Sequence, residues 1–230
     1  MKRILLLLVG LCTITLIQAQ NDCEGYFAYK QGTDFEITSY GGNGKVENVL
    51  QYKVIKNKPI SGGMEITFHN KTYDKKNKLL FEGDFIGKCI NGSYFADVES
   101  IISSAVPQAQ AQGMEMSIEG NEMSYPNNLS TGQKLEDTNI QVKAGMNGMT
   151  LMNMSITYTD RKVEGFEEVE TPAGKFTCAK ITYKSSIRGL GSQNLSGVEY
   201  AAKDIGIVKS EQYNAKGKKI SSTLLTKLKM

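Results

Sequence analysis

The feature that most constrains the fold is a two-residue alternation of apolar and polar side chains over residues 33–228. Met64, Ile66 and Phe68 alternate with polar residues, and residues 152–158 follow the same pattern. Successive residues of a β-strand point to opposite faces of a sheet, so this alternation is typical of strands with one buried face. We therefore predict a mainly β protein, built as a large antiparallel curved sheet or an incomplete β-barrel.

Turn sequences rich in glycine and asparagine divide the alternating pattern into strands. Both residue types adopt the positive φ that tight hairpins need, as in segments 41–44, 91–92 and 214–217. The predicted strands span residues 34–40, 46–56, 64–73, 79–89, 116–123, 140–144, 149–159, 161–170, 176–186, 195–202, 205–213 and 219–228. Such a series of short, turn-linked strands favours an antiparallel meander.

One stretch, residues 97–109, has helical rather than strand spacing. Asp97 suits a helix N-cap, and Pro107 is expected to kink or end the helix. The apolar residues that recur at helical spacing in this stretch are Val98, Ile101, Ile102, Ala105 and Ala109. We expect one covering helix here, placed over the concave face of the sheet or in the mouth of the barrel.

The N-terminus has the pattern of a secretory signal peptide. Lys2 and Arg3 precede an apolar run over residues 4–17, which is shorter than the ~20 residues of a membrane-spanning helix. A lipoprotein signal is the rival interpretation, but Cys12 lies in the middle of the apolar run. We predict a signal peptide at 1–19 and a single β-rich domain at 20–230, exported to the periplasm or the extracellular space, with no transmembrane segment after cleavage.

The charge of the mature chain argues against a polyanionic partner. Removal of Lys2 and Arg3 reduces the 27 basic side chains to 25, against 24 acidic ones. A nucleic-acid interface needs a concentration of positive charge along one surface, and the sequence contains no such stripe. We therefore expect no nucleic-acid partner.

Three cysteines remain after cleavage, and two of them can pair in an oxidising compartment. Cys178 lies in a predicted apolar strand, where a small buried side chain is the ordinary expectation. We therefore expect the disulfide to join Cys23 and Cys89. The other pairings stay open, because connectivity cannot be deduced from sequence alone.

Three segments carry a resemblance to a known family. They are DCEGYFAYKQGTDFEITSY at 22–40, DRKVEGFEEVETPAGKFTCAKITY at 160–183 and DIGIVKSEQYNAKGK at 204–218. On these segments the chain resembles the TapB-like family of secreted bacterial proteins and, more broadly, families of domain-of-unknown-function type. The resemblance implies a β-rich, exported protein without an established biochemical activity, and it supplies no catalytic residues.

Catalytic and metal-binding patterns are weak. The chain has one histidine, His69, which alternates onto the polar face, and it has no G-x-S-x-G motif. One histidine and widely spaced cysteines do not form a zinc-binding pattern. Glu164, Glu168 and Glu170 share a strand face, where we expect pairing with lysines, although a glycosidase-like acid pair is the alternative. We predict a protein that is not an enzyme and has no metal or cofactor.

Methionine is concentrated in the central third of the chain. Thioether side chains can fill gaps in a core, line an adaptable apolar cavity or bind Cu(I). Met152 and Met154 lie on a predicted apolar face, where packing alone explains them. The candidate ligand-binding residues are Met114, Met116, Met123, Met149, Met152, Met154 and Tyr158.

Two functions follow from these patterns. The first is a non-catalytic envelope protein that binds a hydrophobic small molecule in the concave side of the sheet. The alternative is a structural or assembly factor that binds an envelope protein through an exposed sheet edge.

Overall fold

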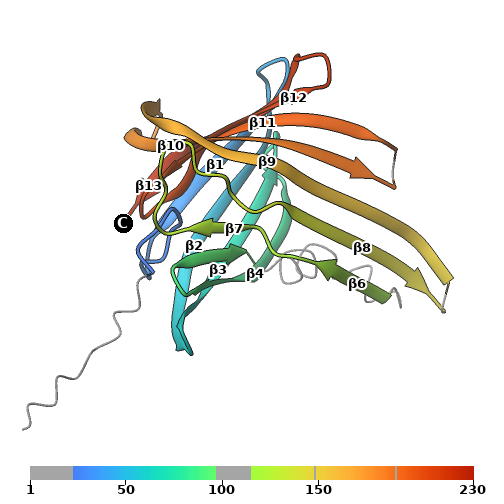
Figure 1. Ribbon diagram of the computed structural model, residues 1–230, viewed down its shortest axis with the longest axis horizontal. Helices are drawn as coiled ribbons and strands as arrows, with labels where there is room; N and C mark the ends of the chain where they lie inside the picture. The colour runs from blue at the N-terminus through green and yellow to red at the C-terminus, as the bar shows by residue number, and fades with distance from the viewer. Residues whose placement is uncertain (1–22, 97–114, 148, 190) are drawn as a thin grey trace, which may run out of the picture.

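The computed structural model describes residues 23–96, 115–147, 149–189 and 191–230. These residues form one antiparallel sheet of 13 strands, and none of them is helical (Figure 1). The prediction of a mainly β protein with an antiparallel sheet is confirmed. The signal peptide predicted at 1–19 and the covering helix predicted at 97–109 lie outside the described residues. Within the described part of the chain, no helix is long and apolar enough to cross a membrane.

The strands form a meander in which most neighbours in sequence are also neighbours in the sheet. Their bounds are β1 (Asp34–Gly41), β2 (Val46–Ile60), β3 (Gly63–Asp74), β4 (Leu79–Ile90), β5 (Ser93–Ala96), β6 (Glu115–Gly120), β7 (Ser124–Pro126), β8 (Thr138–Met146), β9 (Met149–Thr171), β10 (Gly174–Arg188), β11 (Gln193–Ala202), β12 (Gly206–Asn214) and β13 (Lys219–Lys229). The order across the sheet is β6-β8-β9-β10-β11-β12-β13-β1-β2-β3-β4-β5-β7. Tight turns between antiparallel strands produce this order.

Strand β9 corrects one predicted boundary. The sequence predicted separate strands at 149–159 and 161–170, but residues Met149–Thr171 form one strand of 23 residues. Asp160 has a φ of 54°, a left-handed conformation that aspartate tolerates better than most residues. The register between β9 and β10 shifts beside it. An irregularity of this kind bends a strand without ending it, which is why the polar Asp160 is no strand boundary.

Two short strands were missing from the sequence prediction, and one predicted strand was too long. β5 and β7 have 4 and 3 residues, too few to show an alternation. The strand predicted at 116–123 ends at Gly120. This glycine has a φ of 128°, and its backbone approaches Asn139 O so closely that a Cβ would not fit.

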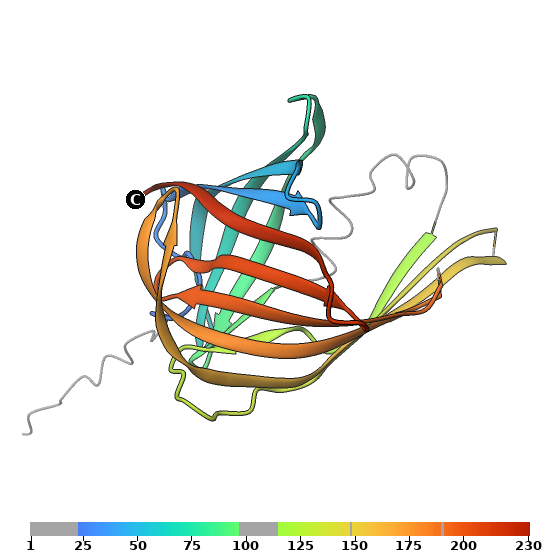
Figure 2. The ribbon, with the colours of Figure 1, turned by 90° about the horizontal axis from the view of Figure 1, so that it is seen from above.

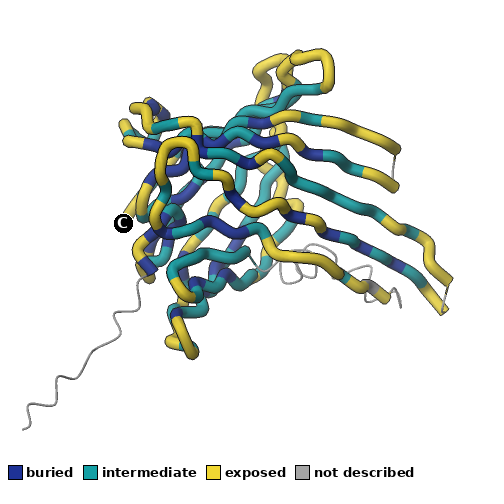
Figure 3. The backbone as a smooth tube through the Cα atoms, in the orientation of Figure 1, coloured by how far each residue is buried: buried dark blue, intermediate teal, exposed yellow. Residues whose placement is uncertain are grey.

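The sheet has two regions that differ in shape. We call β1–β4 and β10–β13 the body, and β6, β8 and residues 149–159 of β9 the wing. The body curls around a concave side, whereas the wing projects away from it together with the end of β10 and the start of β11 (Figures 1 and 2). Exposed residues gather at the tip of the wing, whereas buried residues lie in the body and also alternate along β8 (Figure 3).

The sheet does not close through strand pairing, because β6 and β7 lie at its two ends. Residues 132–135 nevertheless form backbone hydrogen bonds with residues 161–163 of β9. The Arg161 guanidinium donates from Nη1 to Glu136 O at 2.9 Å and from Nη2 to Ser124 O at 3.1 Å. Arg161 is only 2% exposed. A side chain and a loop, rather than a strand pair, therefore join the β7 end of the sheet to β9.

The predicted disulfide is present. Cys23 and Cys89 are bonded, with Cα atoms 5.7 Å apart, a usual separation for a disulfide. Cys178 is a free, buried cysteine on β10, as expected from its apolar strand. Burial raises the pKa of its thiol to about 11, so Cys178 behaves as a small core residue rather than as a nucleophile.

Candidate functional site

A line of aromatic rings crosses the concave side of the body. Phe35 stacks on Tyr52, with ring centroids 5.0 Å apart. Tyr52 meets Phe85 edge-on at 5.8 Å, and Phe85 stacks on Phe68 at 4.8 Å. The register explains this line, because Phe35 lies opposite Tyr52 and Phe68 lies opposite Phe85. Directly opposed residues of antiparallel strands share one face of a sheet, so four strands bring their rings together.

These rings line an apolar pocket of about 210 Å³, which we call the aromatic pocket. Tyr94 and Tyr125 add rings from β5 and β7, and Ile207 and Leu225 add aliphatic surface from β12 and β13. The pocket therefore draws its walls from strands far apart in the sheet. Apolar lining with a few polar groups is the usual character of small-molecule sites.

A more polar groove of about 420 Å³ adjoins the aromatic pocket and shares Phe35 and Tyr52 with it. Asp34, Lys227 and Lys229 contribute charged groups to the groove. Burial raises the pKa of Tyr52 to about 12, so its hydroxyl stays protonated at neutral pH. The two hollows together offer an apolar interior with a charged rim.

The segment before β1 forms part of the pocket wall. Tyr26 and Phe27 line the aromatic pocket, and Phe27 stacks on Tyr94 with centroids 4.4 Å apart. Two hydrogen bonds fix the segment to the sheet region: Asp204 N donates to Gly25 O at 2.7 Å, and Asn57 Nδ2 donates to Tyr29 O at 2.6 Å.

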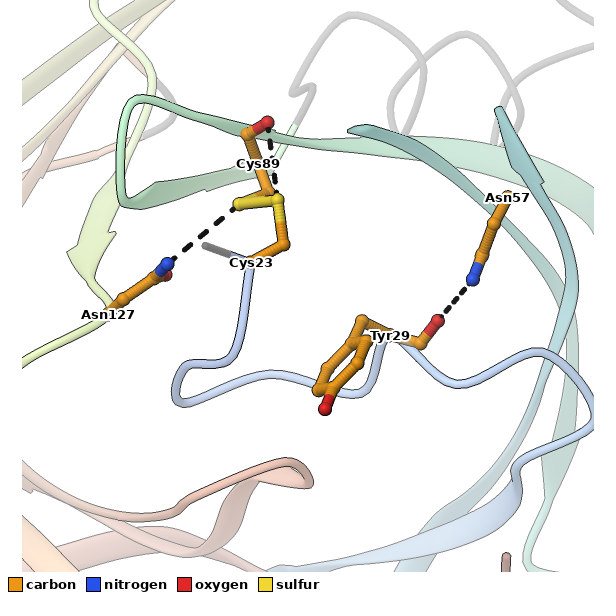
Figure 4. The surroundings of a disulfide bond; sticks show 5 residues. All are labelled: Cys23, Tyr29, Asn57, Cys89 and Asn127. Carbon is orange, nitrogen blue, oxygen red and sulfur yellow. Dashed lines mark hydrogen bonds between the residues drawn. A yellow bond between two sulfur atoms is a disulfide. The ribbon is translucent and has the colours of Figure 1, made fainter. Parts of the chain in front are cut away.

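The disulfide anchors the same segment at its start. Figure 4 shows Cys23 bonded to Cys89 of β4, beside the Asn127 side chain, with the Asn57–Tyr29 hydrogen bond further along. A covalent link at one end and hydrogen bonds along the segment restrict its conformations. The wall that Tyr26 and Phe27 supply is therefore preorganised before any ligand binds.

A polar group of side chains lies beside the aromatic pocket, and we call Tyr125, Arg161 and Glu199 the Glu199 cluster. Tyr125 Oη donates to Glu199 Oε2 at 2.9 Å. The Arg161 guanidinium carbon lies 4.9 Å from the centroid of the Tyr125 ring, within the range of a cation–π interaction. Tyr125 also lines the aromatic pocket, so one side chain belongs to both features.

Burial and charge perturb the titration of this cluster. Burial raises the pKa of Glu199, although the Tyr125 hydrogen bond and the Arg161 charge favour its ionised form. Burial and then the Glu199 charge raise the pKa of Tyr125, Tyr158 and Tyr183. The three phenol hydroxyls are therefore protonated at neutral pH and available as hydrogen-bond donors.

The predicted ligand-binding residues are divided between two places. Met123 and Tyr158 lie near the Glu199 cluster: Met123 Sδ is 3.1 Å from Tyr125 Oη, and the Tyr158 ring is 5.5 Å from the Tyr183 ring. The others belong to the wing or to undescribed parts of the chain. Met152 and Met154 are half-buried on β9, Met149 is 64% exposed at the wing tip, the Met116 backbone pairs with Ala144, and Met114 lies outside the described residues.

Sequence reasoning missed the aromatic pocket and the Glu199 cluster. Phe35, Tyr52, Phe68 and Phe85 each occupy the apolar positions of an alternating strand, so a search for aromatic residues at these positions could have found them. Glu199 gives no such signal, because a glutamate in an alternating strand normally marks the solvated face.

The residues considered for catalysis lie at the surface among charged side chains. His69 Nδ1 lies 2.6 Å from Asp84 Oδ1, and its Nε2 lies 3.1 Å from Glu82 Oε1. Of the three glutamates expected to pair with lysines, Glu164 pairs with Lys162 and Glu170 with Lys175, whereas no ion pair of Glu168 is seen among the described residues. Glu167, which was outside that set, pairs with Lys180. In the described ranges, no group of three or more histidine, cysteine, aspartate or glutamate residues could hold a metal ion.

The fold and the pocket define a class of all-β proteins with an open, curved sheet and an apolar concave side. A family described as DUF3108-like matches residues 30–225, and the chain belongs to this family. The broader part of the sequence resemblance, to families of unknown function, is thereby confirmed. No curated protein matches the sequence.

Solved structures of bacterial proteins share the fold. A protein from Bacteroides fragilis, provisionally described as exported and as having a YmcC-like fold, is 28% identical with a TM-score of 0.72. The match covers 90% of this chain and 100% of that one. A protein from Parabacteroides distasonis, provisionally described as a lipoprotein, is 24% identical with a TM-score of 0.72 and the same coverage. One of these proteins is thus described as exported and the other as a lipoprotein.

Proposed function

We propose that this chain is an exported, non-catalytic envelope protein that binds a hydrophobic small molecule on the concave side of its body. The observation that carries this proposal is the aromatic pocket of about 210 Å³, which opens beside a groove of about 420 Å³ with charged residues. An apolar pocket with polar groups at its margin suits a ligand that has an apolar body. The proposal places the protein in the periplasm or outside the cell and keeps the narrower TapB-like assignment.

A fluorescent apolar probe tests this function. N-phenyl-1-naphthylamine should bind the mature protein and fluoresce more strongly as it leaves water. Ile207 lines the aromatic pocket, so Ile207→Trp should fill part of it and weaken probe binding roughly tenfold, a change of about 1.4 kcal/mol. Leu151→Trp is the matched control, because Leu151 is exposed on the wing. Equal probe affinity for the wild type and Ile207→Trp, with both folded by circular dichroism, would refute the proposal.

Binding of an envelope protein through a sheet edge is the second candidate. β6 lies at one end of the sheet, and among the described strands it pairs only with β8. An unpaired strand edge is a template for an added strand. Crosslinking at Ser117, followed by mass spectrometry of envelope fractions, should recover one partner at stoichiometric yield if this candidate is correct. Recovery of a small molecule without a protein partner favours the first candidate.

A further inference from the structure

Glu199 is a carboxylate on the inside of the molecule. It lies opposite Ile181 on β10 and Ser210 on β12, and its Oε2 accepts a hydrogen bond from Tyr125 of β7. β7 and β11 are far apart in the order of the sheet, so their side chains meet only across its concave side. The Glu199 carboxylate therefore lies on the concave side, where Tyr125 separates it from the aromatic pocket that Tyr125 lines.

The bonding of this carboxylate is incomplete. Oε2 has the Tyr125 hydroxyl as donor, whereas no donor from the described residues reaches Oε1, and no lysine or arginine among them forms an ion pair with Glu199. Arg161 is the nearest cation to Tyr125, but its Nη1 and Nη2 donate to the backbone oxygens of Glu136 and Ser124. The Oε1 oxygen is therefore left to accept a hydrogen bond from water or from the polar group of a ligand.

The carboxylate is also within reach from the solvent side. Glu199 is partly exposed, even though neighbouring protein strongly desolvates it. Tyr125 is the side chain common to both places, since its hydroxyl donates to Glu199 and its side chain lines the aromatic pocket.

We propose that Glu199 accepts a hydrogen bond from the head group of an amphiphile whose apolar chain lies in the aromatic pocket. This inference rests on the proposed function and specifies the ligand class. A hydroxyl or an ammonium group donates to the free Oε1, whereas a carboxylate or phosphate cannot donate and is repelled by like charge. The protein therefore selects long-chain alcohols or amines over fatty acids and other anionic lipids.

Displacement of N-phenyl-1-naphthylamine by dodecylamine, dodecanol and dodecanoate tests the selectivity, because the three compounds share one chain and differ in the head group. Dodecylamine and dodecanol should bind the wild type roughly tenfold more tightly than dodecanoate, as a hydrogen bond to a charged group implies. Equal or tighter binding of dodecanoate would overturn the proposal.

Glu199→Gln separates the role of the carboxylate from that of the pocket. The variant should bind dodecanoate more tightly and dodecylamine more weakly than the wild type, so that their affinities differ by less than about threefold. Glu168→Gln is the matched control, because Glu168 is exposed on β9, and it should keep the wild-type order. An unchanged order in Glu199→Gln would refute the assignment of Glu199.

The same titrations distinguish this inference from the function on which it rests. Probe binding without head-group selectivity refutes the role of Glu199 and leaves the apolar pocket supported. Absence of probe binding to the folded wild type refutes both. Circular dichroism of each variant confirms that the comparison is made between folded proteins.

Discussion

The body and the wing have the same alternation of apolar and polar side chains. The wing buries Ile140, Val142 and Ala144 of β8 as the body buries its core, but the tip of the wing leaves apolar residues exposed. In the body, Phe68 is 3% exposed and packs in a core cluster with Val54, Ile66 and the disulfide. At the tip of the wing, Met149 and Leu151 are 64% and 60% exposed. A single sheet buries a face only where it curves over its own side chains or meets another layer. Alternation therefore predicts which residues share a face, whereas the structure that lies over a face decides whether that face is enclosed.

Loss of the disulfide should reduce stability most, because this bond links the segment before β1 to β4 of the body. The double change Cys23→Ser and Cys89→Ser should lower the free energy of unfolding by about 4 kcal/mol, because the bond closes a loop of 66 residues. Urea denaturation measures the change. A reductant should destabilise the wild type by a similar amount and leave the double variant unchanged. A loss below about 1 kcal/mol would show that the segment before β1 is held mainly by its other contacts.

Truncation of one apolar side chain in the body and one at the tip of the wing compares the stability that the two regions contribute. Phe68→Ala should cost about 3 kcal/mol of unfolding free energy, because it opens a cavity beside the stacked Phe85 ring. Leu151→Ala removes an exposed side chain and should change stability by less than about 0.5 kcal/mol. Thermal and urea unfolding measure both. Similar losses in the two variants would contradict the difference between body and wing.

Arg161 lies where the body, the wing and the β7 end of the sheet meet, and its replacement should have an intermediate effect. Arg161→Lys should destabilise by about 2 kcal/mol, because an ammonium cannot reproduce the planar pair of donors. Hydrogen exchange should become faster at residues 132–135, whose backbone pairs with β9 beside Arg161. Arg188→Lys, at an exposed position, is the control. Unchanged exchange at 132–135 would mean that the loop pairing holds the two ends without the guanidinium.

Glu199→Gln should change the free energy of unfolding least of the four replacements, and it should raise that free energy rather than lower it. Burial raises the pKa of Glu199 in the folded state, so between the unfolded value of about 4.3 and the raised value the folded state binds more protons. Stability contributed by this group therefore falls as the pH rises through that window. Glutamine does not ionise, so the variant should be more stable than the wild type at pH 7 and equal to it near pH 4.

Urea unfolding at a series of pH values checks this prediction, with Glu168→Gln as the exposed control. A variant that is less stable than the wild type at pH 7 would show that the ionised Glu199 is stabilised by its surroundings. Such a result would also argue against our interpretation that Glu199 Oε1 has no donor from the protein.

Much of the fold is predictable from the sequence, because strand alternation and turn chemistry are local properties. The strands around Ile66 and Met154 and the buried state of Cys178 follow from residues within a few positions of each other. The bend at Asp160 was misplaced as a strand boundary, since a bulge and a turn use the same residue types. The short strands β5 and β7 acquire their pairing from distant partners.

The candidate site is less predictable, because its parts meet through tertiary structure. Tyr125 and Glu199 are 74 residues apart in the chain, and neither belongs to a motif. The methionine pattern indicated an apolar face, and the structure places part of it in the wing, whose strands do not line the aromatic pocket. Enclosure depends on the curvature of the whole sheet, which no single segment encodes.

Native mass spectrometry of the mature protein, purified from a bacterium that exports it, tests the central claim most directly. We predict that the folded protein has a mass greater than that of its chain, because an amphiphile is bound to it. Denaturation should release this amphiphile, and analysis of the organic extract should identify it as an alcohol or an amine. The same measurement on Ile207→Trp should show a smaller ligand-bound fraction than the wild type. Wild-type protein without excess mass that also fails to take up added dodecanol would contradict the claim that the concave side is a binding site.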